Sequence, residues 1–109
     1  MNLNQLAAVI EHAQQLENQN QILAAIALYQ EWIDDSENGG RNLLHAAYFN
    51  MGCLLRQAGQ LPQAIEAFHK ALEIKKDFYQ ASVNLGLAFE ASGDNKNALE
   101  AWNQALQLD

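Results

Sequence analysis

Apolar residues recur at steps of three and four along most of the chain, and this spacing predicts six amphipathic helices. The most regular stripe runs from Leu44 to Ala58, and Gly59 comes directly after it. Glycine accepts the left-handed conformation that ends a helix, and Pro62 then suits the first turn of the next helix, where a missing N–H group is tolerated. In the second half of the chain the pattern predicts helices over about 44–58, 62–75, 78–92 and 95–108.

The first third of the chain follows the same plan with less regular spacing. Apolar residues between Leu6 and Leu16 form one helical stripe, and those between Ile22 and Trp32 form a second stripe after the polar run Asn18–Asn20. A polar turn with two glycines, Ser36–Gly40, then shifts the register by five residues. We therefore expect a degenerate copy of the later helix pairs in this region.

The second half of the chain repeats itself after 34 residues. Small and amide side chains lead the match: Asn50, Gly52, Gly59, Ala64, Ala71 and Leu72 fall on Asn84, Gly86, Gly93, Ala98, Ala105 and Leu106. A fixed period in the thirties is typical of stacked helical repeats, in which each helix pair leaves an apolar face that its neighbour covers. We expect one all-α domain over residues 1–109, a solenoid of three stacked helix-turn-helix hairpins with copies over about 6–39, 45–78 and 79–109.

Composition narrows the classes of partner and chemistry. Thirteen acidic residues against six scattered basic ones give a net charge of −7, which disfavours binding to nucleic acid or to a membrane surface. The single cysteine, Cys53, excludes an internal disulfide. No secretory signal, membrane-spanning stretch, phosphate-binding glycine loop or catalytic triad is evident. We therefore expect a cytoplasmic protein that is not an enzyme and holds no cofactor.

One predicted helix carries three side chains with the spacing of half a metal site, Glu66, His69 and Glu73. No second Glu-x-x-His segment accompanies them, and the three residues fall on the side of the helix opposite Phe68. We interpret them as a solvated face and expect no metal.

The run from Tyr48 to Gly52, with Gly59, Ala64 and Phe68 after it, resembles the tetratricopeptide repeat. The third copy matches through Asn84–Gly86, Phe89, Gly93, Ala98, Trp102 and Ala105. The first copy departs from the pattern, as a capping repeat does. The resemblance implies a right-handed superhelix whose concave side is lined by the first helix of each pair, and a protein-interaction scaffold that holds an extended peptide there.

Asn50 and Asn84 are the main candidates for peptide binding, because a side-chain amide can bond both groups of a peptide bond whatever the side chains of the ligand. The resemblance places further residues on the same side: Ala46, Phe49, Cys53, Arg56 and Gln57 from copy two, Gln80, Val83, Leu87 and Glu90 from copy three, and Ile10, Glu11, Gln14 and Glu17 from copy one. The alternative is that both asparagines serve local packing and hydrogen bonds. Arg56 is the lone cation among these positions, so capture of a terminal carboxylate is disfavoured.

The asparagine pair is similar to the asparagine ladder in the repeat arm of O-linked N-acetylglucosamine transferases. That likeness implies a second hypothesis, in which this chain is the substrate-docking arm of a larger bacterial transferase of the O-linked N-acetylglucosamine transferase and SPINDLY group. The last predicted helix motivates a third hypothesis. Its apolar residues Leu99, Trp102 and Leu106 predict an exposed packing face, covered either by further repeats of a longer protein or by a second copy of the chain.

Overall fold

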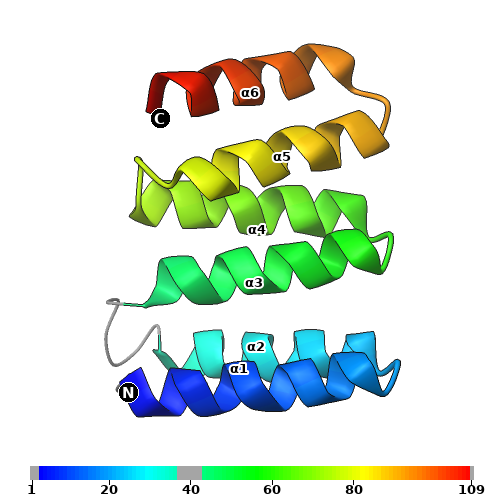
Figure 1. Ribbon diagram of the computed structural model, residues 1–109, viewed down its shortest axis with the longest axis vertical. Helices are drawn as coiled ribbons and strands as arrows, with labels where there is room; N and C mark the ends of the chain where they lie inside the picture. Colours follow the sequence, from blue (N-terminus) through cyan, green and yellow to red (C-terminus); the bar gives the residue numbers. More distant parts are fainter. Residues whose placement is uncertain (1–2, 37–42, 109) are drawn as a thin grey trace.

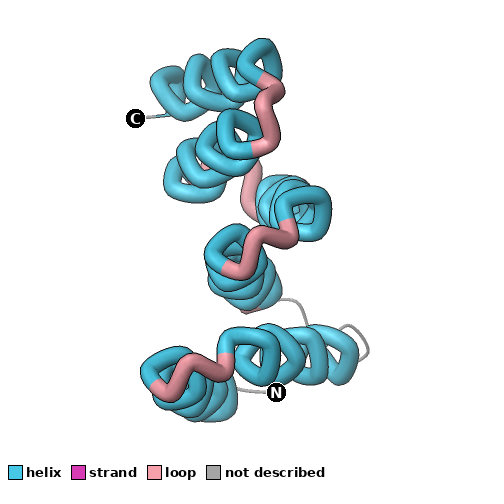
Figure 2. Tube along the Cα trace, turned by 90° about the vertical axis from the view of Figure 1, so that its right-hand side faces the viewer, coloured by secondary structure: helices cyan, strands magenta, loops and turns pink. Residues whose placement is uncertain are grey.

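Six α-helices, stacked in chain order, make up the fold in the computed structural model, which describes residues 3–36 and 43–108 (Figure 1). The helices are α1 (Leu3–Asn18), α2 (Ile22–Ser36), α3 (Leu44–Gln57), α4 (Leu61–Ile74), α5 (Tyr79–Ala91) and α6 (Asn95–Leu108). Each helix packs against the next, and α3 also contacts α5. Figure 2, turned by 90°, shows the three hairpins stacked one above another. The all-α solenoid and its six helices are as the sequence predicts, while the turn expected at 36–40 lies, from residue 37 on, outside the described residues.

In all three hairpins, the turn that ends the first helix contains a residue with a positive φ angle. Gly59 and Gly93 have φ values of 79° and 85°, as their positions predict, and Asn20 takes the same role in the first hairpin with a φ of 60°. In each turn the next N–H group donates to a carbonyl five residues back: Gln21 to Leu16, Gln60 to Leu55 and Asp94 to Phe89, at 2.8, 2.9 and 2.9 Å. This bond is the signature of a glycine-type helix end, and asparagine is the residue that tolerates it best after glycine.

The two helices of each later hairpin cross where a glycine faces an aromatic ring. A Cβ atom added to Gly52 would lie 2.7 Å from the ring of Phe68, and one added to Gly86 would collide with the indole of Trp102. Both glycines therefore serve close packing of an aromatic residue rather than a turn. Trp102 was expected on the exposed face of α6, and this prediction is wrong. Its indole is half-buried against α5 and its Nε1–H donates to the carbonyl oxygen of Val83 at 3.3 Å.

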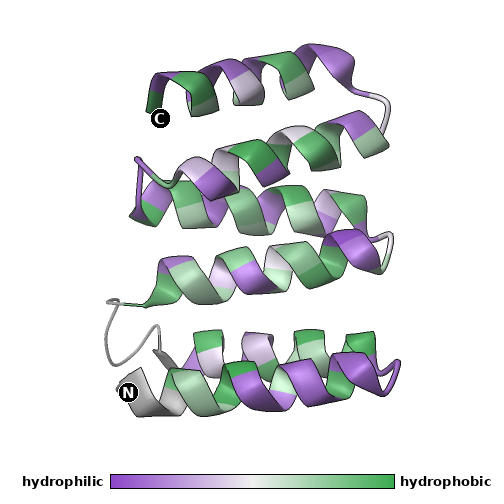
Figure 3. Cartoon of the chain, viewed as in Figure 1, coloured by the Kyte–Doolittle hydropathy of each residue, from purple (hydrophilic) through white to green (hydrophobic). Residues whose placement is uncertain are grey.

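The core is one cluster of apolar side chains that runs through all six helices. Its best-covered members are small residues at helix contacts and a few large ones, with Phe68 fully buried. In Figure 3 the apolar positions of each helix recur along the sides where neighbouring helices meet. The solenoid therefore has no separate cores for its hairpins, and each pair is stabilised by the next one.

Candidate functional site

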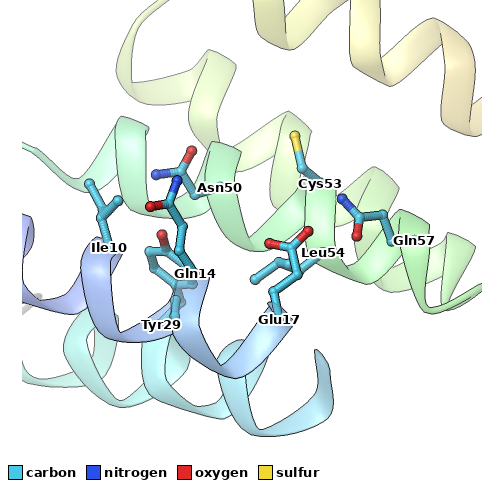
Figure 4. Close-up of a pocket in the computed structure, with 9 residues that line it drawn as sticks. Ile10, Gln14, Glu17, Tyr29, Asn50, Cys53, Leu54 and Gln57 are labelled. Atoms are coloured by element: carbon cyan, nitrogen blue, oxygen red, sulfur yellow. The ribbon is translucent and has the colours of Figure 1, made fainter. Parts of the chain in front are cut away.

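The first helices of the three hairpins, α1, α3 and α5, carry the residues that were expected to bind a partner. We call the side that they form the first-helix face. Between α1 and α3 this face is hollowed by a cavity of about 150 Å³, here named the α1–α3 pocket (Figure 4). Its lining residues are Ile10, Ala13, Gln14 and Glu17 of α1, Tyr29 of α2, and Asn50, Cys53, Leu54 and Gln57 of α3. Six of the expected groove residues thus lie together around one pocket.

The pocket has an apolar floor and a polar rim. Ile10, Ala13 and Leu54 contribute only carbon atoms, whereas the rim carries the amides of Gln14, Asn50 and Gln57 and the carboxylate of Glu17. Figure 4 shows Gln14 and Asn50 close to the phenol oxygen of Tyr29, with Glu17 and Gln57 toward the other end. Such a combination of apolar walls and a few convergent polar groups is typical of a binding site.

Asn50 is hydrogen-bonded to Tyr29 across two helix pairs. Burial is the main influence on Tyr29 and raises the pKa of its phenol, and the bond with the Asn50 side chain acts against that rise. This bond connects the first hairpin to the second and holds both side chains at the wall of the pocket.

Asn84 is also held by partners within the chain. Its Nδ2 donates to the carbonyl oxygen of Gln80, one helical turn earlier, at 2.8 Å, and its Oδ1 accepts the thiol of Cys53 at 3.9 Å. The structure therefore shows the local hydrogen bonds that were considered as the alternative role of both asparagines. Each amide still has one N–H and at least one lone pair beyond these bonds.

Cys53 sits between the two asparagines and is a thiol, not a thiolate. Burial chiefly raises its pKa, the charge of Arg56 lowers it, and the charge of Glu17 raises it again. A thiol whose pKa is raised is a poor nucleophile and metal ligand. Cys53 therefore belongs to the hydrogen-bonded wall of the face and not to a reactive centre.

The remaining predicted positions divide into covered and accessible ones. The ring of Phe49 packs against Phe68 and Phe78, with ring centres 5.9 and 5.0 Å apart, so its face is used inside the array. Arg56 is half-buried, and its Nε is buried without a hydrogen-bond partner in the described chain. Val83 and Leu87 are half-buried and Gln80 is exposed.

Three residues of the pocket were not among the predicted groove positions, Ala13, Leu54 and Tyr29, and of these only Tyr29 carries a polar group. Tyr29 occupies the position that Phe68 and Trp102 hold in the later hairpins, and the apolar pattern assigned it to the core. The residue type could have indicated a polar contact at this position, because a buried tyrosine needs a hydrogen-bond partner for its hydroxyl group.

No group of three or more metal-binding side chains occurs within residues 3–36 and 43–108. Glu66 and Glu73 are exposed, as expected of a solvated face, and so is His69. Its ring contacts the edge of Phe89 on α5, with centres 6.1 Å apart. His69 therefore lies at the contact between α4 and α5. Among the described helices, none has the length and hydrophobicity needed to cross a membrane.

The outer side of α6 is a second surface without a cover in the described chain. Leu99 and Leu106 are 59% and 72% exposed. At the matching positions of α4, Ile65 and Leu72 are half-buried and packed against the core, because α5 covers them. Leu99 and Leu106 thus lie on the face of α6 that corresponds to the buried face of α4 in the second hairpin.

Family comparisons agree with this geometry. Models of the tetratricopeptide repeat match residues 45–78, which contain α3 and α4, and residues 79–109, which contain α5 and α6. This chain belongs to the tetratricopeptide repeat family. Its repeats support a protein–protein interaction scaffold, on a fold that is typically non-catalytic.

Solved structures of one other protein are similar over most of this chain. Two crystal structures of MamA superpose with TM-scores of 0.76 and 0.75, each at 28% sequence identity and over 88% of this chain. The matched region is 53% and 50% of those chains, so this chain spans about half the length of the MamA structures. Comparison with curated proteins found no match. The likeness to the arm of O-linked N-acetylglucosamine transferases is not tested by these findings and stays a prediction.

Proposed function

We propose that the first-helix face holds an extended segment of a partner protein, with Asn50 and Asn84 bonding its backbone and the α1–α3 pocket taking one of its side chains. The observation that carries this proposal is that both amides occupy the same position of successive repeats and each is held in place by a bond within the chain. A held amide loses little conformational entropy on binding, so more of each new hydrogen bond appears as affinity.

Each amide contributes modestly on its own. A hydrogen bond to a peptide group is worth about 0.5–1.5 kcal/mol, so the pair supplies about 1–3 kcal/mol and the neighbouring side-chain contacts supply the remainder. Val83 and Leu87 are half-buried and offer apolar contact beside Asn84. The proposal therefore predicts binding that tolerates sequence variation in the partner but requires an extended backbone.

Peptide selection followed by mutation tests this function. Peptides selected for binding from a random library are labelled, and their affinity is measured by fluorescence anisotropy for the chain and for the Asn50→Ala, Asn84→Ala double variant. The double variant should bind about 10-fold or more weakly, following the two lost bonds. The control is Gln63→Ala with Gln104→Ala, which removes two exposed amides from α4 and α6. Equal affinity in chain and double variant, with unchanged melting temperatures, would sink the proposal.

We further propose, as a second candidate function, that two copies associate through α6. The specific observation in its favour is the contrast between the two ends of the array. Ala8, His12 and Gln15 on the outer side of α1 are exposed and largely polar. The hollow nearby is lined by Glu31 and Asp35 as well as by Val9, Leu28 and Trp32. That end therefore does not offer α6 a wholly apolar counterpart. A second α6 does offer one. In an antiparallel pair centred on the exposed Asn103, the leucines of one copy face those of the other.

Sedimentation velocity over a wide range of concentration tests this second candidate. A dimer that is promoted by salt is expected, because each copy carries a net charge of −7 and salt screens the repulsion. Leu106→Glu should abolish it, whereas Leu23→Glu, at an exposed leucine of α2, should not. A chain that stays monomeric at every concentration and salt level rules out self-association.

A further inference from the structure

The α1–α3 pocket has an electrostatic character that the family's fold does not dictate. Among its nine lining residues the only charged one is Glu17, and the other polar groups are three amides and a phenol. The Glu17 charge raises the pKa of both Tyr29 and Cys53, so its field reaches both walls of the pocket. Neither Tyr29 nor Cys53 carries a positive charge.

The pocket offers a cation one acceptor-only group, the carboxylate of Glu17, and three amide oxygens beside it. Asn50, Gln14 and Gln57 each bring one of these oxygens, which rotation of the amide can turn inward. An anionic group would be repelled by Glu17, and an apolar group would strip water from these acceptors without replacing its hydrogen bonds. A cation with several N–H donors satisfies all of them.

The size of the pocket also fits such a group. A cavity of about 150 Å³ is known to hold a benzene-sized molecule. A guanidinium group with its last two methylenes has a similar number of heavy atoms. Its planar donors suit a carboxylate and neighbouring amide oxygens better than an ammonium does. The apolar floor of Ile10, Ala13 and Leu54 can contact the methylenes.

The charge at the position of Glu17 changes sign from one copy of the repeat to the next. When the copies are aligned on Asn20, Gly59 and Gly93, the position of Glu17 is held by Arg56 in the second copy and by Glu90 in the third. Arg56 lowers the pKa of Cys53, so its charge acts on the pocket from outside the lining. The second copy therefore does not repeat the carboxylate that lines the α1–α3 pocket.

From these observations we infer that the α1–α3 pocket binds an arginine side chain of the partner segment, with its guanidinium on the Glu17 carboxylate and the Asn50 amide oxygen. The inference rests on the proposed use of the first-helix face and adds the residue type that this pocket selects.

Paired small probes test the pocket apart from the rest of the face. ¹⁵N-labelled chain is titrated with N-acetyl-L-arginine amide and, separately, with N-acetyl-L-citrulline amide, which has the same shape without the charge. The arginine probe should shift the signals of Glu17 and the side-chain amides of Gln14, Asn50 and Gln57. The citrulline probe should bind about 10-fold more weakly or not at all, as expected when a charged hydrogen bond is lost.

Charge-neutralising variants complete the experiment. Glu17→Gln should weaken the arginine probe about 10-fold, Arg56→Gln should strengthen it, and Glu90→Gln, the matched carboxylate in the third copy, should leave it unchanged. Equal binding of the two probes overturns the inference and shows a neutral amide site. Unshifted pocket signals at the solubility limit of the arginine probe, or full binding by Glu17→Gln, also overturn it. Because the probes have no extended backbone, none of these results depends on whether Asn50 and Asn84 hold a peptide.

Discussion

The first and second hairpins reach the same outline with different residues at their helix crossing. In the second hairpin Gly52 leaves room for Phe68, which is fully buried. In the first, Ala13 stands at the glycine position and Tyr29 at the aromatic one, and the tyrosine is bonded to Asn50 of the next hairpin. The second crossing is all apolar, whereas the first brings a hydroxyl group to the wall of the α1–α3 pocket. The comparison teaches that a degenerate repeat can keep the packing of its family and still bring a polar group from its core to the wall of a pocket.

Removing the ring of the second hairpin should have the largest effect. Phe68→Ala deletes a fully buried ring and is expected to lower the free energy of unfolding by about 3–5 kcal/mol. Urea denaturation followed by circular dichroism measures this loss. A loss under about 1 kcal/mol would show that the crossing is not the centre of the packing.

Exchanging the small residues of the two crossings should have the next largest effect. Gly52→Ala places a Cβ atom 2.7 Å from the Phe68 ring and is expected to cost about 1–3 kcal/mol, although alanine is the better helix former. Ala13→Gly should cost only about 1 kcal/mol, the difference in helix propensity. The two variants are compared in the same urea experiment. A stabilised Gly52→Ala variant would mean that the helices of the second hairpin can separate freely.

Exchanging the turn residues should have a smaller effect. Gly59→Ala forces a side chain into the left-handed region and is expected to cost about 1–2 kcal/mol. Asn20→Gly should change stability by less than about 0.5 kcal/mol, since both residues tolerate a φ of 60°. Thermal melts of the two variants measure the difference. If Gly59→Ala and Asn20→Gly lost the same amount of stability, the two turns would not share the same requirement for a positive φ angle.

Removing the hydroxyl of Tyr29 should have a smaller effect on stability than Gly59→Ala. Tyr29→Phe is expected to cost about 0.5–1.5 kcal/mol, since it leaves Asn50 without its partner.

The pH dependence of Tyr29→Phe gives an independent check. Burial raises the Tyr29 pKa above its ordinary value of 10.0, so the unfolded chain ionises first and stability is lost as the pH rises above that value. Urea unfolding at pH 8 and at higher pH should show a smaller alkaline loss in Tyr29→Phe than in the unchanged chain, and equal losses would contradict the raised pKa.

Apolar spacing was sufficient to predict all six helices and the stacking of the hairpins, because helix periodicity and the 34-residue match are properties of the sequence itself. It was also sufficient to predict the left-handed turns at Gly59 and Gly93. The turn at Asn20 was not foreseen, because asparagine occurs in many other conformations.

Six of the nine residues that line the α1–α3 pocket are among the predicted groove positions, but their hydrogen bonds were not predicted. The first-helix positions of Asn50 and Cys53 followed from the repeat register, and both line the pocket. The bond of Asn50 to Tyr29 and that of Cys53 to Asn84 connect different hairpins, and no spacing along one helix reveals them. Trp102 was misplaced for a related reason, since an apolar residue on the last helix can face inward or outward and only the partner Gly86 decides.

The most direct test of the central claim, that the first-helix face holds an extended partner segment, is a map of side-chain amide signals in ¹⁵N-labelled chain with a selected peptide added. The amides of Asn50 and Asn84 should shift together with that of Gln57, while Gln63 on α4 and Gln104 on α6 stay unchanged. Shifts confined to α4 and α6, with Asn50 and Asn84 unmoved, would contradict the claim and place the binding surface elsewhere on the array.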